Sequence, residues 1–496
     1  MSELTIRTLA GDDKSLASDD VDVLAANLRG ELVPQGAPGY DDARQIWNAM
    51  IDRRPALIAR CEGVSDVMQA VRFAREHNLL VSVRGGGHNI AGNALADGAM
   101  LIDLSSMRSV RVDPRAHTAR VEPGALLTDF DRETQAFGLA TPLGINSTTG
   151  IAGLTLGGGY GWLSRRFGLS VDNLLAADIV TADGALLEAS DQQNSDLFWA
   201  IRGGGGNFGI VTSFLFNLHA VGPEVLAGLI VHPADDAAGL LRRYRDVVDA
   251  APETLTAWVV LRKAPPLPFL PPQVHGQDVV VIAVCYSGPV ADGERALRPL
   301  RAIGSPHADV VGPTPYTGFQ AAFDPLLTPG ARNYWKTHNF MSLDDALIDT
   351  IVEQFRRSPG PQCEIFLAHL GGAVSSRPEE STAYTVRSAQ FIMNAHARWD
   401  DATADDAHTG WARSTYAATK PWAAPGAYVN FLTRDEQDRV QSAYGMNYER
   451  LSALKQRYDP DNFFRVNQNI VPAGSVRIPQ ASIGGVASPD AQTMSG

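Results

Sequence analysis

The sequence predicts an α+β protein of two domains, and three observations lead to this prediction. The chain has 496 residues, enough for two or three packed units at about 150 residues per domain. Apolar residues make up 45% and charged residues 20% of it, which is typical of a folded globular protein. Ten of the 46 glycines stand in three clusters at 85–87, 157–159 and 203–206, whereas strand and helix patterns without such clusters follow Pro223.

Charge and cysteine usage exclude several classes of protein. Lys and Arg number 42 against 55 Asp and Glu, a net charge of -13, which argues against nucleic acid as a partner. The three cysteines, Cys61, Cys285 and Cys363, lie far apart without a CxxC pair. We therefore expect core thiols, no metal site and no disulfide framework.

The sequence also predicts where the protein works. Residues 1–20 are acidic and polar, without the basic and apolar segments of a signal or transit peptide. The longest apolar run, Val279 to Tyr286, is far shorter than the ~20 residues that span a bilayer and predicts a buried strand. We expect a cytoplasmic protein without a membrane partner, and the sequence predicts no oligomeric state.

The first predicted elements form a βαβ unit that ends in a glycine loop. Ala56 to Ala59 is a short buried strand, Ser65 to His77 an amphipathic helix with Ser65 as N-cap, and Leu79 to Val83 a second strand. Further elements of this half are strands at 100–104, 109–112 and 119–122, a helix at 125–137, and a hairpin of 175–181 with 185–188 around Asp183-Gly184.

The second half alternates strands with helices. Strands are predicted at 225–231, 256–261 and 278–286, and helices at 234–250 and 292–303. The loop 264–272 contains five prolines, and we expect it to be stiff and extended, either as a flap over a substrate or as a surface strap. Residues 434–458 have a helical, charged pattern that ends at Asp459-Pro460.

The glycine clusters admit two readings. Gly204, Gly206 and Gly209 satisfy GxGxxG, but a helical segment precedes them and a strand, 210–214, follows, so the match fails the strand-then-helix test for a dinucleotide site. A nicotinamide-linked dehydrogenase is therefore the weaker alternative. Glycine loops also let backbone N–H groups approach phosphates closely, so three of them favour a pyrophosphate cofactor over mere tight turns.

A family resemblance rests on several ordered motifs. They are Val81-Ser-Val-Arg-Gly-Gly-Gly-His-Asn89, Leu101-Ile-Asp-Leu-Ser105, Gly150-Ile-Ala-Gly-Leu-Thr-Leu-Gly-Gly-Gly-Tyr-Gly161, Gly203-Gly-Gly-Gly-Asn-Phe-Gly-Ile-Val-Thr212, Tyr334-Trp-Lys336, Tyr444-Gly-Met-Asn-Tyr-Glu-Arg-Leu451 and Asn467-Gln-Asn-Ile470. Over roughly residues 40 to 472 the chain resembles the vanillyl-alcohol-oxidase superfamily. More narrowly, it is similar to bacterial berberine-bridge-enzyme-like FAD-linked oxidoreductases.

This resemblance implies a two-domain PCMH-type FAD-binding fold of the α+β class. It places the FAD-binding domain at residues 1–220, with its core at about 50–220, and an α+β substrate domain at 221–424. The antiparallel sheet of the substrate domain would cover the flavin. Residues 425–475 would return to the FAD-binding domain, and 476–496 would form a flexible tail.

The resemblance also implies which residues bind FAD. Those around the pyrophosphate would be Arg84, Gly85, Gly86, Gly87, His88 and Asn89. Those lining the rest of the cofactor would be Pro142, Gly144, Thr149, Gly150, Gly153, Leu154, Gly159, Gly209, Ile210 and Val211, with Asn467 and Asn469 reaching it from the C-terminal return.

Two positions govern the expected attachment of the flavin. His88 matches the family histidine that is bonded to the 8α-methyl carbon, a bond that a neutral imidazole can form with the quinone-methide form of the flavin. The alternative is a histidine that only hydrogen-bonds the cofactor. Many relatives add a second bond through a cysteine where this chain has Asn146. We therefore expect one covalent bond, through His88, and a wider pocket.

Several residues are candidates for the catalytic base. Relatives often carry Tyr-x-Asn-Tyr and use the last tyrosine, whereas this chain has Tyr428-Val-Asn-Phe431. On a strand, Tyr428 and Asn430 would face away from Phe431. Tyr428 is nevertheless the candidate chosen, and the alternatives are Lys336, His369 and Tyr444, each of which core packing or a structural hydrogen bond explains better than catalysis does.

The predicted function is an FAD-dependent oxidase that takes hydride from an alcohol, hemiacetal or amine carbon to flavin N5. Thr149 occupies the family position linked to oxygen access, which favours O2 as acceptor and H2O2 as product. Trp258, Trp335, Trp399 and Trp422 could stack on a sugar or an aromatic substrate. The alternative, motivated by Phe431, is a non-catalytic flavin-bearing or carbohydrate-binding protein.

Overall fold

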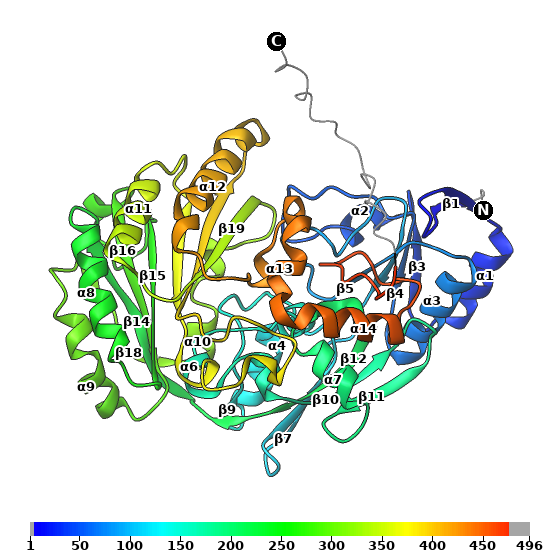
Figure 1. The fold of residues 1–496 in the computed structure, drawn as a ribbon, viewed down its shortest axis with the longest axis horizontal. Coiled ribbons are helices and arrows are strands. Elements are labelled where there is room, and N and C mark those ends of the chain that lie inside the picture. The colour runs from blue at the N-terminus through cyan, green and yellow to red at the C-terminus, as the bar shows by residue number, and fades with distance from the viewer. Residues whose placement is uncertain (1–3, 476–496) are drawn as a thin grey trace.

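The computed structural model describes residues 4–475, and the tail predicted over 476–496 lies outside the described residues. Two halves lie side by side (Figure 1), with the N-terminal sheets in one and a large antiparallel sheet in the other. The predicted α+β class with two principal parts is confirmed by this arrangement.

A four-stranded sheet begins the fold and contains the predicted βαβ unit. Its strand order is β3-β4-β6-β5, with β4 and β5 both parallel to β6. The bounds are β3 Glu31–Pro34, β4 Leu57–Arg60, β5 Val81–Arg84 and β6 Met100–Asp103. Helix α3, Val64–Glu76, connects β4 to β5 and packs its apolar face on the sheet.

The predicted N-cap of α3 is wrong. The helix starts at Val64 after Gly63, so Ser65 lies inside its first turn and makes no capping bond. The carboxylate of Asp66 instead accepts the backbone N–H groups of Arg29, Gly30 and Glu62. A buried carboxylate with three N–H donors fixes the helix start more firmly than one hydroxyl would.

A five-stranded antiparallel sheet completes the N-terminal half. Its order is β11-β10-β12-β8-β7, and the bounds are β7 Val110–Asp113, β8 Thr118–Val121, β10 Leu174–Val180, β11 Leu186–Ser190 and β12 Ile210–Asn217. The hairpin predicted around Asp183-Gly184 is β10–β11. Helices α4, Leu127–Gln135, and α7, Ser195–Ile201, share its apolar core.

Shorter elements accompany these two sheets. They are β1 Leu4–Arg7, β2 Asp13–Leu16, α1 Ser18–Asn27, α2 Tyr40–Ala43, β9 Leu139–Ala140, α5 Ile151–Leu156, α6 Ser164–Phe167 and β13 His219–Ala220.

The second half is built on one antiparallel sheet in the order β17-β14-β16-β15-β20-β21-β19, with β18 also on β14. Its strands are β14 Glu224–Pro233, β15 Leu255–Lys263, β16 Asp278–Tyr286, β17 Ala308–Asp309, β18 Gly312–Pro315, β19 Arg332–Phe340, β20 Glu364–His369 and β21 Phe391–Trp399. The strands and helices predicted for this half are confirmed within a few residues.

Four helices cover the outer face of this sheet (Figure 1) and leave the inner face toward the N-terminal half. They are α8 Ala237–Asp249, α9 Val290–Arg301, α11 Asp345–Arg356 and α12 Asp405–Thr419. Alternation along β15 shows how a strand serves both faces. Val259 and Leu261 pack on the helices, whereas Val260 and Arg262 point the other way. The inner face is therefore free to line a site.

The proline-rich loop between β15 and β16 is not extended as predicted. The N–H of Leu267 donates to the carbonyl of Pro265 at 2.8 Å, and that of Leu270 to Leu267 at 3.0 Å. Two successive turns thus fold the loop back, and Leu270 packs against the edge of the sheet. Pro265 and Leu267 face the inner side of the molecule, so the loop forms a wall rather than a strap.

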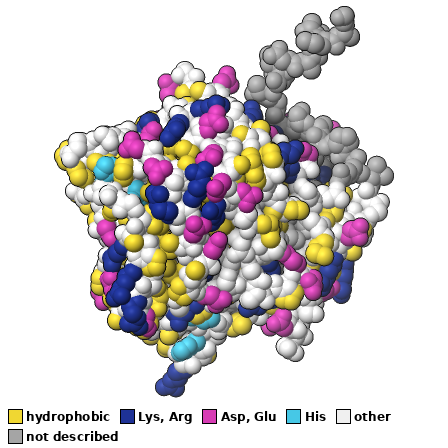
Figure 2. Space-filling view, turned by 60° about the vertical axis from the view of Figure 1, so that its left-hand side comes forward, with side chains coloured by type: hydrophobic (Ala, Val, Ile, Leu, Met, Phe, Trp, Pro, Cys, Tyr) yellow, Lys and Arg dark blue, Asp and Glu magenta, His cyan; other side chains and the backbone are white. Residues whose placement is uncertain are grey.

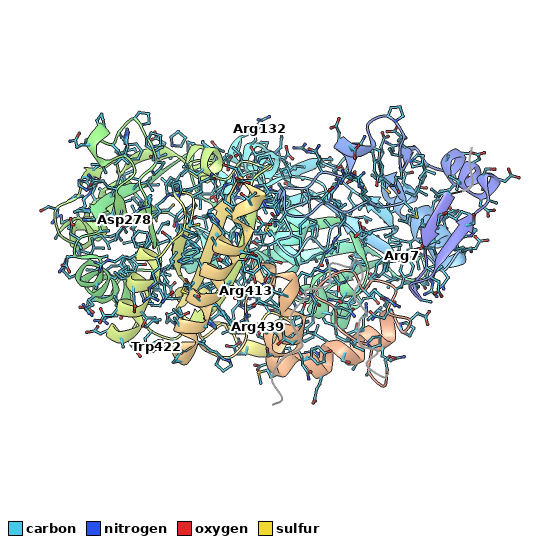
Figure 3. The ribbon with its side chains drawn as sticks, turned by 90° about the horizontal axis from the view of Figure 1, so that it is seen from above. Arg7, Arg132, Asp278, Arg413, Trp422 and Arg439 are labelled. Atoms are coloured by element: carbon cyan, nitrogen blue, oxygen red, sulfur yellow. The ribbon has the colours of Figure 1, made fainter. Side chains whose placement is uncertain are left out.

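The chain then returns to the N-terminal half. The helical pattern predicted over 434–458 is present as four consecutive pieces that end at Tyr458 as predicted: η10 Arg434–Arg439, α13 Val440–Tyr444, η11 Gly445–Asn447 and α14 Tyr448–Tyr458. Gly445, with a positive φ of 49°, separates α13 from η11. From above (Figure 3), Arg413 of α12 and Arg439 of η10 lie between Asp278 at one end and Arg7 at the other. The return therefore crosses the junction of the halves.

Two surface properties complete the description. On the face shown in Figure 2, acidic and basic side chains of the described residues are interspersed, without a continuous basic stripe. Within residues 4–475, no helix combines the length and apolar character that crossing a bilayer requires.

Candidate active site

A cavity of about 410 Å³ lies where the two halves meet. Three parts of the chain line it: the glycine-rich loops of the N-terminal half, the inner face of the eight-stranded sheet, and the C-terminal return. Apolar side chains predominate, so the cavity can exclude water around a few polar groups.

In the first wall, the glycine-containing backbone segments around Gly86 and Gly150 approach each other closely. A Cβ placed on Gly86 would lie 2.4 Å from the Cα of Gly150, and one on Gly150 would lie 2.4 Å from the nitrogen of Gly86. A Cβ on Gly85 would lie 2.9 Å from the carbonyl oxygen of Pro123. Because none of these contacts leaves room for a side chain, the two loops present main-chain groups to the cavity.

His88 ends the first glycine loop and opens to the cavity. Its ring stacks on Trp47 with centroids 5.1 Å apart, and its Nε2 lies 3.1 Å from the Thr148 hydroxyl. Thr148 in turn donates to Asn146 Oδ1 at 2.7 Å. Burial lowers the pKa of His88 to about 4, so its imidazole is neutral at pH 7.

Most of the residues predicted to bind cofactor line this one cavity. Those that do are Gly85, Gly86, Gly87, His88, Asn89, Gly144, Thr149, Gly150, Gly153, Leu154, Gly209, Ile210, Val211 and Asn467, together with the predicted base Tyr428 and with Asn146. The sequence motifs thus converge in space although they span nearly 400 positions.

Four predicted residues lie outside the lining. The guanidinium of Arg84 pairs with Asp103, the facing residue on β6, and so holds β5 in register. The carbonyl of Pro142 accepts from the Ser170 hydroxyl, and Gly159 donates its N–H to Tyr428. Asn469 lies on the return, with its Oδ1 buried and without a partner.

The third glycine loop is tied to the return by a network that sequence reasoning missed. Asn207 Nδ2 donates to the carbonyl of Gln468 at 3.1 Å, and its Oδ1 accepts from the N–H of Ile470 at 2.9 Å. Behind it, the fully buried ammonium of Lys455 donates to the Asn207 carbonyl and to Asp459, each at 2.6 Å. The sequence signal that could have revealed this network is Lys455 and Asp459, which lie four residues apart at the end of α14.

The stretch 428–431 is a turn of 3₁₀ helix, η9 Val429–Phe431, and not a strand. The predicted alternation is therefore wrong, because residues three apart in such a helix lie on one side. Tyr428 and Phe431 both line the cavity, with ring centroids 4.9 Å apart. The Tyr428 oxygen accepts from Asn430 Nδ2 at 3.0 Å. Burial raises its pKa to about 12, which disfavours the phenolate.

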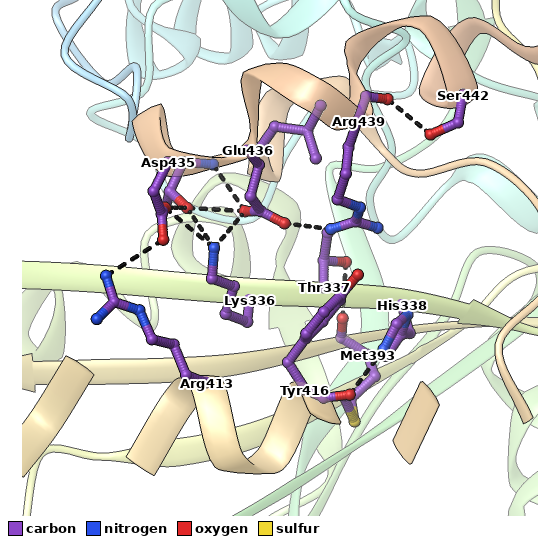
Figure 4. Close-up of polar contacts among 12 residues, drawn as sticks. Lys336, Thr337, His338, Met393, Arg413, Tyr416, Asp435, Glu436, Arg439 and Ser442 are labelled. Atoms are coloured by element: carbon purple, nitrogen blue, oxygen red, sulfur yellow. Dashed lines mark hydrogen bonds and ion pairs between the residues drawn. The ribbon is translucent and has the colours of Figure 1, made fainter. Parts of the chain in front are cut away.

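The other base candidates have structural partners. Lys336 points away from the cavity into η10 (Figure 4), where it donates to Thr433 and pairs with Asp435 and Glu436. His369 lies beside the Arg165 guanidinium, outside the lining. Tyr444 does line the cavity, but its hydroxyl donates to the Gly204 carbonyl.

The opposite wall is the inner face of the eight-stranded sheet, and its residues Arg262, Glu364 and His396 were not predicted. Arg262 on β15 faces Glu364 on β20, Glu364 faces His396 on β21, and His396 faces Trp335 on β19. We call these four residues the polar row. All four line the cavity, so the row crosses four neighbouring strands.

Apolar side chains surround the polar row. They are Leu229, Val231, Trp258, Val260, Leu267, Leu270, Val279, Val281, Ala283, Phe323, Leu326, Leu327 and Phe366. Two of the four tryptophans named from the sequence, Trp258 and Trp335, are therefore in the lining. Trp399 instead packs in the helix-covered core and donates to Asp405, and Trp422 lies at the edge of that core.

The lining fits FAD better than a nicotinamide dinucleotide. The Gly86–Gly150 contact leaves backbone N–H groups without side chains, which suits a pyrophosphate, and Asn467 holds a buried Oδ1 without a protein partner in the same lining. Around Gly204 to Gly209, helix α7 precedes and strand β12 follows, the reverse of the order that a Rossmann site requires.

Comparison with known proteins gives the same cofactor. The FAD binding domain family matches residues 55–190, and the "Berberine and berberine like" family matches residues 427–471. The first match contains the Gly86–Gly150 wall and His88, and the second contains Tyr428, Phe431 and Asn467.

Full-length relatives share these segments. A Dictyostelium discoideum FAD-linked oxidoreductase is 31% identical over 471 residues, covering 94% of this chain and 99% of the relative. (R)-6-hydroxynicotine oxidase of Paenarthrobacter nicotinovorans is 30% identical over 461 residues, covering 90% and 98%.

Solved structures share the fold. 6-Hydroxy-D-nicotine oxidase of Arthrobacter nicotinovorans superposes with a TM-score of 0.80 at 28% identity, covering 89% of this chain and 98% of that one. The BBE-like 1 protein of Physcomitrella patens gives a TM-score of 0.83 at 23% identity, covering 92% and 100%.

Proposed function

Because this chain belongs to the berberine-bridge-enzyme-like FAD-linked oxidoreductases, we propose that it is an FAD-dependent oxidase of a small-molecule alcohol, hemiacetal or amine. When bound, FAD supplies the hydride acceptor and passes the electrons to O2, which gives H2O2. The observation that carries this proposal is the Gly86–Gly150 contact, which opens a backbone-lined cavity beside His88.

His88 is the residue that bonds the flavin. Its imidazole is neutral because burial lowers its pKa to about 4, and a neutral imidazole is the nucleophilic form. Stacking on Trp47 and the Thr148 hydroxyl hold the ring at the cavity edge. Asn146 is the next residue in the same hydrogen-bonded chain, because its Oδ1 accepts from the Thr148 hydroxyl. An amide cannot form a thioether, so His88 is the single point of attachment.

The division of labour follows the two halves. Residues 1–220 and 425–475 bind the cofactor, and residues 221–424 bind the substrate. The family matches at 55–190 and 427–471 support this division, as do the eight strands of the large sheet, which all lie between Glu224 and Trp399. Thr149 lines the cavity, which is compatible with its proposed role in oxygen access. The cytoplasm is the proposed location.

The attachment is tested by acid precipitation of purified wild type, His88→Ala and His219→Ala. His219 is a matched control, because it is also a partly buried imidazole with a pKa lowered to about 4 by burial, but it lies outside the cavity lining. Flavin absorbance should stay in the pellet for wild type and His219→Ala and move to the supernatant for His88→Ala.

Two other outcomes contradict parts of the proposal. Flavin released from wild type contradicts the covalent bond, and protein without flavin after expression with excess riboflavin contradicts the oxidase. Adding Asn146→Cys to His88→Ala should return part of the flavin to the pellet, because a thiol at residue 146 supplies the missing second nucleophile.

A further inference from the structure

The polar row provides the charged site on a largely apolar wall, to which Asn394 of β21 adds one amide with a buried, unpartnered Oδ1. Arg262 Nη1 donates to Glu364 Oε2 at 2.8 Å, and His396 Nδ1 lies 3.4 Å from Glu364 Oε1. Among the described residues that line the cavity, Glu364 is the only carboxylate. Its charge is balanced by Arg262, so the row as a whole favours an uncharged polar group over an anion.

Glu364 has hydrogen-bonding capacity left for a ligand. A carboxylate offers about four lone-pair directions, and Arg262 occupies one of them. The side chain is 14% exposed, and this exposure is to the cavity that it lines. The Arg262 guanidinium lowers the pKa of Glu364 against the opposing effect of burial, so the group is an acceptor at neutral pH.

His396 is arranged to share a proton that reaches Glu364. Its Nε2 lies 3.0 Å from Asn333 Oδ1, an oxygen that also accepts from Arg398 at 3.3 Å. Nε2 must therefore carry the hydrogen, and Nδ1 is left as an acceptor that faces the carboxylate. Two acceptors that face each other across 3.4 Å are stabilised when one proton comes between them.

The surroundings restrict what the row can hold. In the next row of the same face, Val260 pairs with Phe366 and with Val281, and Val281 pairs with Val231; Phe366 also pairs with Asn394, the one polar side chain of this row among the described residues that line the cavity. Leu229, Val260 and Phe366 are each only half-buried, so the apolar surface that they expose faces the cavity. A sugar would leave most of its hydroxyls without partners on such a wall, which is unfavourable for each buried group.

The geometry points to Glu364 as the acceptor of the substrate proton, and to an aromatic or alkyl alcohol or amine, apolar apart from that one group, as the substrate. This inference rests on the proposed oxidase. The substrate loses a hydride from its α-carbon to the flavin and a proton from its O–H or N–H to Glu364, so a C–O or C–N single bond becomes C=O or C=N. Phe431 then needs no hydroxyl.

Binding can be measured without turnover. The probe 2-phenyl-2-propanol is an aromatic alcohol without an α-hydrogen, and xylobiose is the sugar for comparison. Titrated against flavin-loaded protein and followed by flavin absorbance and tryptophan fluorescence, the aromatic alcohol should bind at least about tenfold tighter than xylobiose. Glu364→Gln should weaken it roughly tenfold, since a charged acceptor is replaced by a neutral one. Glu353→Gln, at an exposed helical ion pair, is the matched control.

Turnover separates Glu364 from Tyr428. Benzylic alcohols and benzylamines are screened anaerobically for flavin bleaching, and the best substrate is used with Glu364→Gln and Tyr428→Phe. Glu364→Gln should lower kcat by about 10² or more, which is the usual contribution of a positioned base, and should lower it far more than Tyr428→Phe does.

Each failure is distinguishable. Xylobiose binding as tightly as the aromatic alcohol, or sugars alone bleaching the flavin, overturns the substrate class. A Glu364→Gln variant within twofold of wild type in both assays, or a larger loss of kcat from Tyr428→Phe, overturns the role of Glu364. In all of these cases the flavin remains in the acid pellet, whereas protein without flavin overturns the oxidase itself.

Discussion

The two walls of the cavity are built on opposite principles. On the N-terminal side, backbone meets backbone, as at Gly86 and Gly150, and the absence of side chains forms the site. On the sheet side, side chains alone form the site, and the strands beneath them are regular. In the proposed function the first wall would hold the cofactor and the second would hold the substrate.

The difference teaches where a substitution acts. At Gly86 and Gly150 of the backbone wall an added Cβ collides with main chain, which cannot move without the segment behind it. On the side-chain wall a substitution changes one contact and leaves the sheet ladder intact. Changes at the first wall should therefore affect folding and cofactor together, and changes at the second should affect the substrate alone.

The largest effect is expected from Gly86→Ala. Its Cβ would lie 2.4 Å from the Gly150 backbone, so the two loops must separate, which should cost about 4 kcal/mol of unfolding free energy and most of the bound flavin. The ratio of flavin to protein absorbance and urea unfolding measure the two effects.

Gly410→Ala is the matched control for this change. Gly410 is an exposed position inside α12 with no atom within 4 Å of an added Cβ, and alanine there should stabilise the protein by about 0.5 to 1 kcal/mol. A Gly86→Ala protein with full flavin content and wild-type stability would show that the backbone wall tolerates side chains after all.

The same difference explains what the sequence could predict. The glycine clusters were found because glycine is required where backbones meet, and such positions stand out in one chain, whereas His88 and Asn146 were identified through the family resemblance of the motifs around them. The polar row was missed because alternation along β15 or β20 shows that a strand has two faces, but not which face meets the cavity. That choice is made by the packing of α8, α9, α11 and α12 on the other side.

Local conformation accounts for the remaining errors. Tyr428 to Phe431 was expected to alternate as a strand, but the N–H of Phe431 donates to the carbonyl of Tyr428 at 3.0 Å and closes a 3₁₀ turn, and Asn430 Nδ2 ties this turn to the carbonyl of Leu154 at 3.1 Å. The prolines of 264–272 predicted an extended loop, but the hydrogen bonds of Leu267 and Leu270 fold it. In both cases long-range or turn contacts outweigh the intrinsic preference of the residues.

A smaller effect is expected from Lys455→Met, which asks whether side chains behind the backbone wall support it. Lys455 and Asp459 are both fully buried, and Asp459 also accepts the N–H groups of Phe463 and Phe464. Removing the ammonium leaves that carboxylate uncompensated, which should cost about 3 kcal/mol and loosen the Asn207 carbonyl. Urea unfolding measures the loss.

Its control is Arg357→Gln, at the exposed pair of Arg357 with Glu353, where the change should stay below about 0.5 kcal/mol. If Lys455→Met lost as little unfolding free energy as this control, the C-terminal return would not depend on the buried ion pair of Lys455 with Asp459. The backbone wall would then be held in place by its glycine contacts alone.

The seam between the two halves is expected to give a difference that depends on pH rather than one fixed loss. Asp131 on α4 accepts from Gln320 of α10, Tyr316–Gln320, at 3.1 Å, and burial raises its pKa to about 7. The folded protein therefore keeps a proton that the unfolded chain releases near pH 4. The stability that this group contributes is complete below about pH 4 and is lost as pH rises to 7. Asp131→Asn does not titrate, so its stability relative to wild type should increase by up to about 1.4 kcal/mol per pH unit in that window.

Urea unfolding at pH 4.5, 5.5, 6.5 and 7.5 measures this difference. The control is Glu133→Gln, an exposed position on the same helix, whose change in unfolding free energy should stay below about 0.5 kcal/mol. A constant difference across the four pH values would mean that Asp131 is ionised in the folded state, and that the seam is held by charge rather than by a neutral hydrogen bond.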